Sequence, residues 1–274
     1  MTVHPSLQTY ADAWTQSIES IAELVKPLVE GEWNRRTPCP GWSVRDIVSH
    51  IIGMECEQLG DPRPIHSLPR DLYHVQNDIQ RYMEMQVDVR RHHTAPEMTS
   101  ELEYTLIRRM RQLRNETRAP DTMVRAPLGT EQTLELALHM RAFDVWVHEQ
   151  DLRTALGQPG NLDSPGALVA RDTLLAALPK VVAKDAGAPA NSAVVLDVSG
   201  PVEFLRTVRV DGEGRGSIDG APSLGPAVTL TTDWETYYRL ACGRVRAQAV
   251  EDQVKIEGDQ ELATAILHNF AVTP

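Results

Sequence analysis

Hydrophobic residues in the first half of the chain recur at steps of three and four, the spacing of an amphipathic helix. Between residues 7 and 28 they form one stripe, made of Leu7, Tyr10, Trp14, Ile18, Ile21, Val25 and Leu28. Turn-forming residues at 36–41 interrupt the pattern. A second helix is then predicted to begin at Ser43, because Asp46 follows three residues later and the pair is a capping signal.

Three further helical patterns complete this half of the chain. One covers residues 72–82, and the next follows the box-like pair Ser100 and Glu103. A longer pattern covers about 133–155. Several amphipathic helices in succession predict a bundle with a shared apolar core.

The pattern changes to that of a mixed α+β domain after residue 157. A helix is predicted near 167–182 and a small-residue linker at 186–190. The remaining predictions are strands at 193–198, 204–210, 227–231 and 253–257, and helices at 234–241 and 259–268. We therefore expect a domain boundary between Gly157 and Asn191.

Composition narrows the classes of function. The net charge of −11 argues against a nucleic-acid-binding protein, since contacts with phosphate need clustered Lys and Arg. Neither a signal peptide nor a membrane-spanning stretch is expected. The three cysteines are widely spaced and suggest no disulfide framework, which favours a soluble cytoplasmic protein.

The helix at 133–155 carries the most informative polar pair. Asp144 and His148 are one turn apart on the stripe that includes Ala137 and Met140, and a buried carboxylate needs a partner such as a metal ion. His50 lies at the margin of the apolar face of the second helix. Spacing alone leaves open a chance Asp/His pair and a half-buried histidine bonded to the backbone.

Two segments resemble the mycothiol-dependent maleylpyruvate isomerase family, whose members have a DinB-like four-helix bundle. They are TPCPGWSVRDIVSH at 37–50 and DVWVHEQDL at 144–152. Residues 228–230, 243–244 and 255–259 resemble the small sterol-carrier-like domain of that family. The resemblance implies an α+β protein with a bundle at 1–160, a connecting helix and linker at 161–190, and a small α+β domain at 191–274.

The same resemblance implies a metal site formed by His50, Asp144 and His148. The isomerase has glutamate where this chain has Asp144, so the shorter side chain puts direct coordination in question. Arg244 matches an arginine that the family brings to the substrate, although a surface arginine in a turn is the alternative. Asp151 is expected to hold the free ring nitrogen of His148.

The implied chemistry is thiol activation. Two histidines and one carboxylate leave a coordination position open and favour zinc, with nickel or iron as alternatives. A coordinated thiol loses its proton and becomes reactive. We therefore expect a metal-dependent mycothiol S-transferase acting on a small, acidic electrophile, without using the chain's own cysteines.

Two alternatives remain open at this point. A cis-trans isomerase of the maleylpyruvate type would use the same metal and the same thiol. A non-catalytic lipid or small-molecule binding protein would result if the bundle had lost its metal. The oligomeric state is not predicted.

Overall fold

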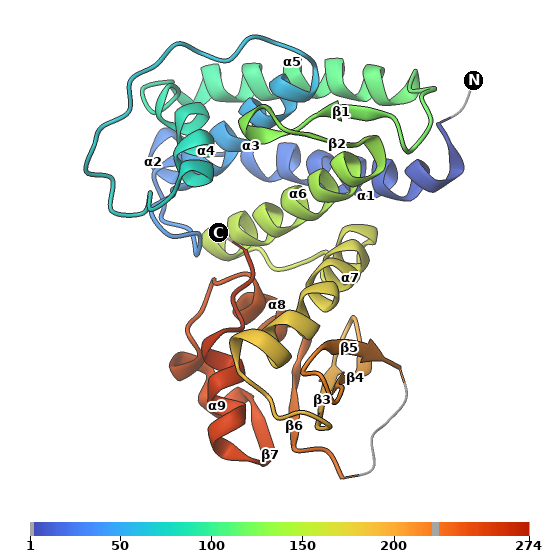
Figure 1. Ribbon diagram of the computed structural model, residues 1–274. Helices are drawn as coiled ribbons and strands as arrows, with labels where there is room; N and C mark the ends of the chain where they lie inside the picture. The colour runs from blue at the N-terminus through green and yellow to red at the C-terminus, as the bar shows by residue number, and fades with distance from the viewer. Residues whose placement is uncertain (1–2, 221–224, 274) are drawn as a thin grey trace. The chain divides into compact units, whose positions relative to one another are not determined.

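The computed structural model describes residues 3–220 and 225–273. The chain divides into two compact units, Met1–Gly160 and Asn161–Pro274. Each unit has its own elements in Figure 1, and each is described separately below. No helix in the described ranges is both long enough and apolar enough to cross a membrane.

The first unit is built on a bundle of long helices. These are α1 (Pro5–Val25), α3 (Val44–Gln58), α5 (Ala95–Arg114) and α6 (Leu134–Leu156). Helix α1 packs against α5 and α6, and α3 packs against the same two helices. The side chains of Trp14, Ile47 and Trp146 are fully buried between them, so the apolar stripes face one core.

Shorter elements complete the first unit, and Figure 1 shows them around the bundle. Helix α2 (Glu30–Trp33) follows α1, and α4 (Asp78–Asp88) packs against α3. An antiparallel hairpin of β1 (Met123–Arg125) and β2 (Glu131–Thr133) leads into α6. The sequence did not predict α2 or this hairpin, because each is too short to develop a hydrophobic period.

Capping residues set the ends of the two helices that matter most for the site. Ser43 is the N-cap of α3, and Ser43 and Asp46 form the predicted capping box. Thr133 caps α6, since its side chain accepts a hydrogen bond from the Leu136 backbone amide. Gly157 ends α6 in the left-handed region at φ +68°, which glycine adopts without strain.

Two predicted helix starts are wrong. Helix α4 begins at Asp78, not near Leu72, because the Asn77 side chain caps it by accepting from the Gln80 amide. Helix α5 begins at Ala95, five residues before the expected pair at Ser100. Its capping box is Thr94 with Glu97, and Pro96 lies in its first turn, where proline is tolerated.

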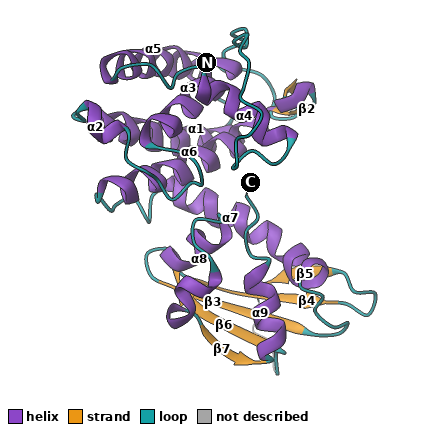
Figure 2. Ribbon diagram, turned by 90° about the vertical axis from the view of Figure 1, so that its left-hand side faces the viewer, coloured by secondary structure: helices purple, strands orange, loops and turns teal. Residues whose placement is uncertain are grey.

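The second unit contains a mixed sheet whose strand order is β5-β4-β3-β6-β7. Strands β3 and β6 run parallel, and the other neighbours are antiparallel. Figure 2 shows these strands together with the helices of the unit. The strands are β3 (Ala193–Ser199), β4 (Phe204–Val210), β5 (Gly216–Asp219), β6 (Val228–Asp233) and β7 (Lys255–Gly258).

The helices of the second unit pack on this sheet. They are α7 (Pro165–Lys180), α8 (Trp234–Ala241) and α9 (Gln260–His268), with a π-helical turn at Val181–Asp185 and a 3-10 segment at Ala247–Gln253. Helix α7 contacts β4 and β5. It therefore lies in the second unit, Asn161–Pro274, within the segment 161–190 that was expected to be a connecting helix and linker.

Candidate functional site

His50 lies on α3, two turns after the Ser43 cap. Only 3% of its surface is exposed. Its Nε2 atom is 3.2 Å from Oδ2 of Asp144, and its Nδ1 atom is buried with no hydrogen-bond partner among the described residues. The backbone-bonded histidine that spacing alone allowed is therefore not what the structure contains.

Helix α6 supplies the other two side chains. Asp144 and His148 are one turn apart, and the His148 Nε2 atom is 3.6 Å from Asp144 Oδ1. The imidazole rings of His50 and His148 meet edge to face, with centroids 5.0 Å apart. The side chains on this face of α6 become more buried toward the C-terminal end of the helix. Met140 is 40% exposed, whereas His148 is 5% exposed.

The side chains of His50, Asp144 and His148 lie close enough together that they could hold a metal ion. One ligand atom from each residue lies within 4.8 Å of the other two. Ligand atoms at ordinary zinc distances in a tetrahedral site lie about 3.3 Å apart. The separations of 3.2 Å and 3.6 Å are close to that value. Aspartate is thus long enough to lie beside both histidines, although it is one methylene shorter than the glutamate that the family resemblance implies at this position.

The charge states also suit metal binding. Burial lowers the pKa of His50, with only partial opposition from Asp144, so its ring is neutral at pH 7. Burial alone would raise the pKa of Asp144, but Arg141 and the two histidines hold it well below its usual value. A neutral imidazole and an ionised carboxylate are the forms that bind metals.

Arg141 connects Asp144 to the core of the bundle. Its Nη1 donates to Asp144 Oδ2 at 2.8 Å, and its Nε donates to Glu55 Oε1 at 2.9 Å. Glu55 also accepts from Arg109 Nε and Trp14 Nε1, each at 3.0 Å. Glu55 on α3 thus joins α1, α5 and α6. The i, i+3 spacing of Arg141 and Asp144 was the only sequence signal for this network.

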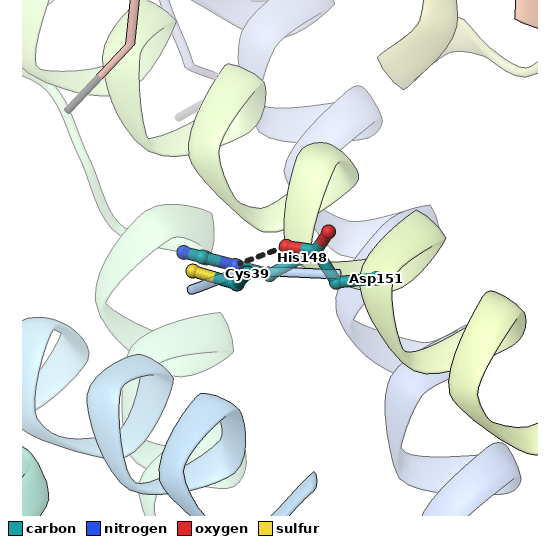
Figure 3. A group of neighbouring side chains, drawn as sticks. All are labelled: Cys39, His148 and Asp151. Atoms are coloured by element: carbon teal, nitrogen blue, oxygen red, sulfur yellow. Dashed lines mark hydrogen bonds and ion pairs between the residues drawn. The ribbon is translucent and has the colours of Figure 1, made fainter. Parts of the chain in front are cut away.

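Asp151 and Cys39 also lie close to the His148 side chain (Figure 3). Asp151 Oδ2 is 3.0 Å from His148 Nδ1, the position expected of a residue that orients the ring. Cys39 Sγ is within 4.8 Å of the nearest ring nitrogen and of an Asp151 oxygen. We expected no part for Cys39 in the site, because residue spacing along the chain cannot show that a loop cysteine lies near a distant helix.

Trp42 covers the two histidines. The ring centroid of Trp42 is 5.0 Å from that of His50 and 5.7 Å from that of His148. Its Nε1 atom donates to Oε2 of Glu84 on α4 at 2.9 Å. The loop before α3 therefore forms one wall of the site, and the tryptophan is anchored by a buried carboxylate.

Arg244 belongs to the second unit, just after α8. Its Nη1 donates to the Cys242 carbonyl oxygen at 2.6 Å, and the residue is half-buried. Gly243 precedes it at φ +64° and allows the chain to turn there.

Known families and solved structures resemble the chain over nearly its whole length. The mycothiol maleylpyruvate isomerase N-terminal domain matches residues 14–153, and the C-terminal domain of the same family matches residues 169–265. No curated protein matches the sequence.

Among solved structures, the mycothiol-dependent maleylpyruvate isomerase aligns with a TM-score of 0.57 at 16% identity, covering 94% of this chain and 96% of that one. A histidine-to-alanine mutant of it aligns with the same TM-score at 15% identity and with the same coverage. Sterol carrier protein 2 like 2 from Aedes aegypti aligns over 37% of this chain and 96% of its own, with a TM-score of 0.30 at 17% identity.

The structural matches agree with the predicted fold class, an α+β protein with a helical bundle followed by a small α+β domain. The N-terminal match alone covers just over half of the sequence. From these two domain matches we conclude that the chain belongs to the mycothiol-dependent maleylpyruvate isomerase family.

Proposed function

We propose that this chain is a metal-dependent enzyme that ionises the thiol of mycothiol and adds it to a small electrophile. The observation that carries the proposal is the cluster of His50, Asp144 and His148, whose ligand atoms lie within 4.8 Å of one another. Two imidazoles and one carboxylate are a donor set of catalytic zinc sites, which keep a position open for another ligand. Zinc is therefore the ion proposed, as the sequence predicted.

The protein's own groups prepare the site for this chemistry. A divalent ion bound there would supply the charge that ionises a coordinated thiol. Asp151 fixes the orientation of the His148 ring through the 3.0 Å contact at Nδ1. Arg141 keeps Asp144 ionised and directed toward the histidines. Arg244 is proposed to bind a carboxylate of the substrate, a role that a guanidinium fulfils with two parallel hydrogen bonds.

Addition of the thiolate has two possible outcomes. In S-transfer, a carbon–sulfur bond forms at the electrophilic carbon, and either a leaving group departs or the neighbouring carbon takes up a proton. In cis-trans isomerisation, the adduct rotates about the former double bond and expels the thiolate again. We expected S-transfer first and isomerisation as the alternative, and the isomerase named in the solved relatives supports the alternative.

Mass spectrometry with zinc-loaded protein and mycothiol separates the two outcomes. A cis-unsaturated acid such as maleylpyruvate should be converted to its trans isomer, which has the same mass and is distinguished by its retention time in liquid chromatography before the mass spectrometer. With a transferase substrate, the product gains the mass of mycothiol. The protein without mycothiol is the control, and absence of both products with metal bound and maleylpyruvate present would contradict the proposed isomerase activity.

Metal analysis tests the non-catalytic alternative. A binding protein of the sterol-carrier type needs no ion in the bundle, so purified protein that takes up no divalent metal would favour it. The reducing cytoplasm is the proposed compartment, because three widely spaced cysteines offer no disulfide framework.

A further inference from the structure

A second group of possible metal ligands lies beside His148 and includes a residue of the loop before α3. The Sγ atom of Cys39, a ring nitrogen of His148 and a carboxylate oxygen of Asp151 all lie within 4.8 Å of one another. Figure 3 shows the three side chains together. Among the described residues, this is the only such group besides His50, Asp144 and His148, and it is the one that contains sulfur.

The three side chains of this second group are shielded from solvent. Cys39 is 9% exposed, His148 5% and Asp151 2%. Exposed acidic groups gather on many protein surfaces without binding a metal, whereas a buried carboxylate is costly unless its charge is compensated. The 3.0 Å contact between Asp151 Oδ2 and His148 Nδ1 provides part of that compensation. A cation placed among the three donors would provide it in full.

Two backbone segments hold these donors in place. His148 and Asp151 are three residues apart on α6, so they project from the same face of the helix. Cys39 lies in a tight turn, where its carbonyl oxygen accepts from the Trp42 amide at 3.2 Å. The Thr37 amide donates to the Trp42 carbonyl oxygen at 3.1 Å and closes the same loop. A metal ion would therefore meet a preformed group of donors.

The separations of the donor atoms suit a single ion. Sulfur, nitrogen and oxygen donors around one tetrahedral zinc-like ion lie about 3.3–3.8 Å apart. The Asp151 and His148 atoms, at 3.0 Å, are close to that range. The Cys39 Sγ atom lies at most 4.8 Å from its neighbours, so a shift of about 1 Å brings it into the same coordination shell.

The donor types determine which ions this group would prefer. A thiolate and a carboxylate together carry two negative charges, which match one divalent cation in a buried place. Thiolate is a soft ligand and selects soft ions. The cluster of His50, Asp144 and His148 has only nitrogen and oxygen donors, so a soft ion finds its sulfur ligand at Cys39 alone.

We propose that Cys39, His148 and Asp151 form a second metal site, which binds a soft divalent ion such as cadmium. The ion replaces the proton of the Cys39 thiol, which passes to solvent, and it binds the unprotonated His148 nitrogen that faces Asp151. No oxidant or reductant takes part. The assignment does not depend on the proposed function, since neither a thiol cofactor nor a substrate is involved.

Titration of the purified full chain with cadmium tests this site. A bond between cadmium and a thiolate gives an ultraviolet charge-transfer absorption, which should saturate at about one cadmium ion per chain. Cys39→Ser should abolish this absorption. Cys56→Ser and Cys242→Ser remove the other two thiols and should keep it. Cadmium held at His50, Asp144 and His148 gives no such signal, because that cluster has no sulfur.

The carboxylate is tested by Asp151→Asn. Asparagine keeps an oxygen that can accept from His148 Nδ1 but loses the charge, so cadmium binding should weaken about tenfold or more. Asp163→Asn changes an exposed carboxylate and should leave the cadmium affinity unchanged. Alkylation of Cys39 by iodoacetamide, followed by peptide mass spectrometry, gives a second readout on the wild-type chain. Bound cadmium should slow this alkylation.

Three results would overturn the assignment. One is a charge-transfer absorption that survives in Cys39→Ser, which would mean adventitious binding at another thiol. Another is equal cadmium affinity of Asp151→Asn and the wild type, since the carboxylate would then be no ligand. The third is alkylation of wild-type Cys39 at the same rate with and without cadmium, a result that does not depend on whether any variant folds.

Discussion

Asp144 is in contact with three basic side chains. Its Oδ2 atom is 2.8 Å from Arg141 and 3.2 Å from His50, and its Oδ1 atom is 3.6 Å from His148. A carboxylate that bridges two imidazoles while an arginine fixes its ionised form is preorganised for a cation. The residue that departs from the pattern implied by the family resemblance thus contacts both histidines and an arginine.

This arrangement predicts how changes at Asp144 behave. Asp144→Ala should lower metal occupancy and turnover together, because the anionic donor is lost. Asp144→Glu should be milder, since it keeps the charge and restores the residue of the isomerase. Metal analysis and steady-state rates on the same preparations measure both effects. Full activity of the Asp144→Ala variant would show that Asp144 takes no part in metal binding or turnover.

His148 should be indispensable for metal binding. We expect about one divalent ion per wild-type chain and almost none in His148→Ala, because two remaining donors hold zinc weakly. Plasma mass spectrometry of dialysed protein measures the content. His139→Ala removes another imidazole from α6, one stacked on Tyr10, and should keep its metal. Full occupancy in His148→Ala would exclude this histidine from the ligand set.

At the scale of elements, the buried carboxylate of Glu55 on α3 links this helix to three other helices of the bundle. Glu55 is 1% exposed and accepts hydrogen bonds from Trp14 on α1, Arg109 on α5 and Arg141 on α6. Removing one partner of a buried ion pair leaves the others uncompensated, which typically costs about 3–5 kcal/mol. The position of α6, and with it Asp144, depends on this contact.

Glu55→Gln should therefore lower the free energy of unfolding by about 3 kcal/mol or more at pH 7. Urea unfolding followed by tryptophan fluorescence measures the change. Glu19→Gln alters an exposed carboxylate on α1 and should leave stability within about 0.5 kcal/mol of the wild type. Equal stability of the two variants would contradict the structural role of Glu55.

The same carboxylate predicts an acid dependence of stability. Burial raises the pKa of Glu55, but Arg141, Arg109 and Trp14 outweigh this and hold it below its ordinary value of 4.5. A lowered pKa in the folded state means that its contribution is fully present above the unfolded value and is lost as pH falls below it. Unfolding free energies measured from pH 7 downward should fall below about pH 4.5 in the wild type, and less steeply in Glu55→Gln.

At the scale of the whole molecule, each unit is expected to contribute different residues to the proposed reaction. The first unit contains the proposed metal ligands, and the second contains Arg244. If Arg244 binds a substrate carboxylate, Arg244→Ala and Arg244→Lys should both lower turnover of an acidic substrate, because lysine cannot form the paired contact. A loss of about 10- to 100-fold is expected for alanine.

Metal content and thiol affinity should stay unchanged in both Arg244 variants. Arg246→Ala, an exposed arginine two residues away, is the control for charge in the same segment. Unchanged rates in Arg244→Ala would leave it as an ordinary surface residue. Loss of metal in these variants would instead show that Arg244 stabilises the fold.

Local sequence patterns determined much of this fold. The α6 helix was predicted nearly to its ends, because Thr133 and Gly157 are local signals and the helical period is continuous between them. The Ser43–Asp46 box likewise marked the start of α3. Strands β3 and β4 were visible as apolar runs between turns. Strand β5 escaped prediction because it is mostly exposed and polar.

Only the tertiary structure decided which polar side chains contact one another. The sequence and its family resemblance named His50, Asp144 and His148, but not the Arg141–Glu55 network, whose members are 86 positions apart. Trp42 lies near both histidines, and Cys39 near His148, only because the loop before α3 folds against them. Such contacts have no period or spacing along the chain, since they arise only when separate helices pack together.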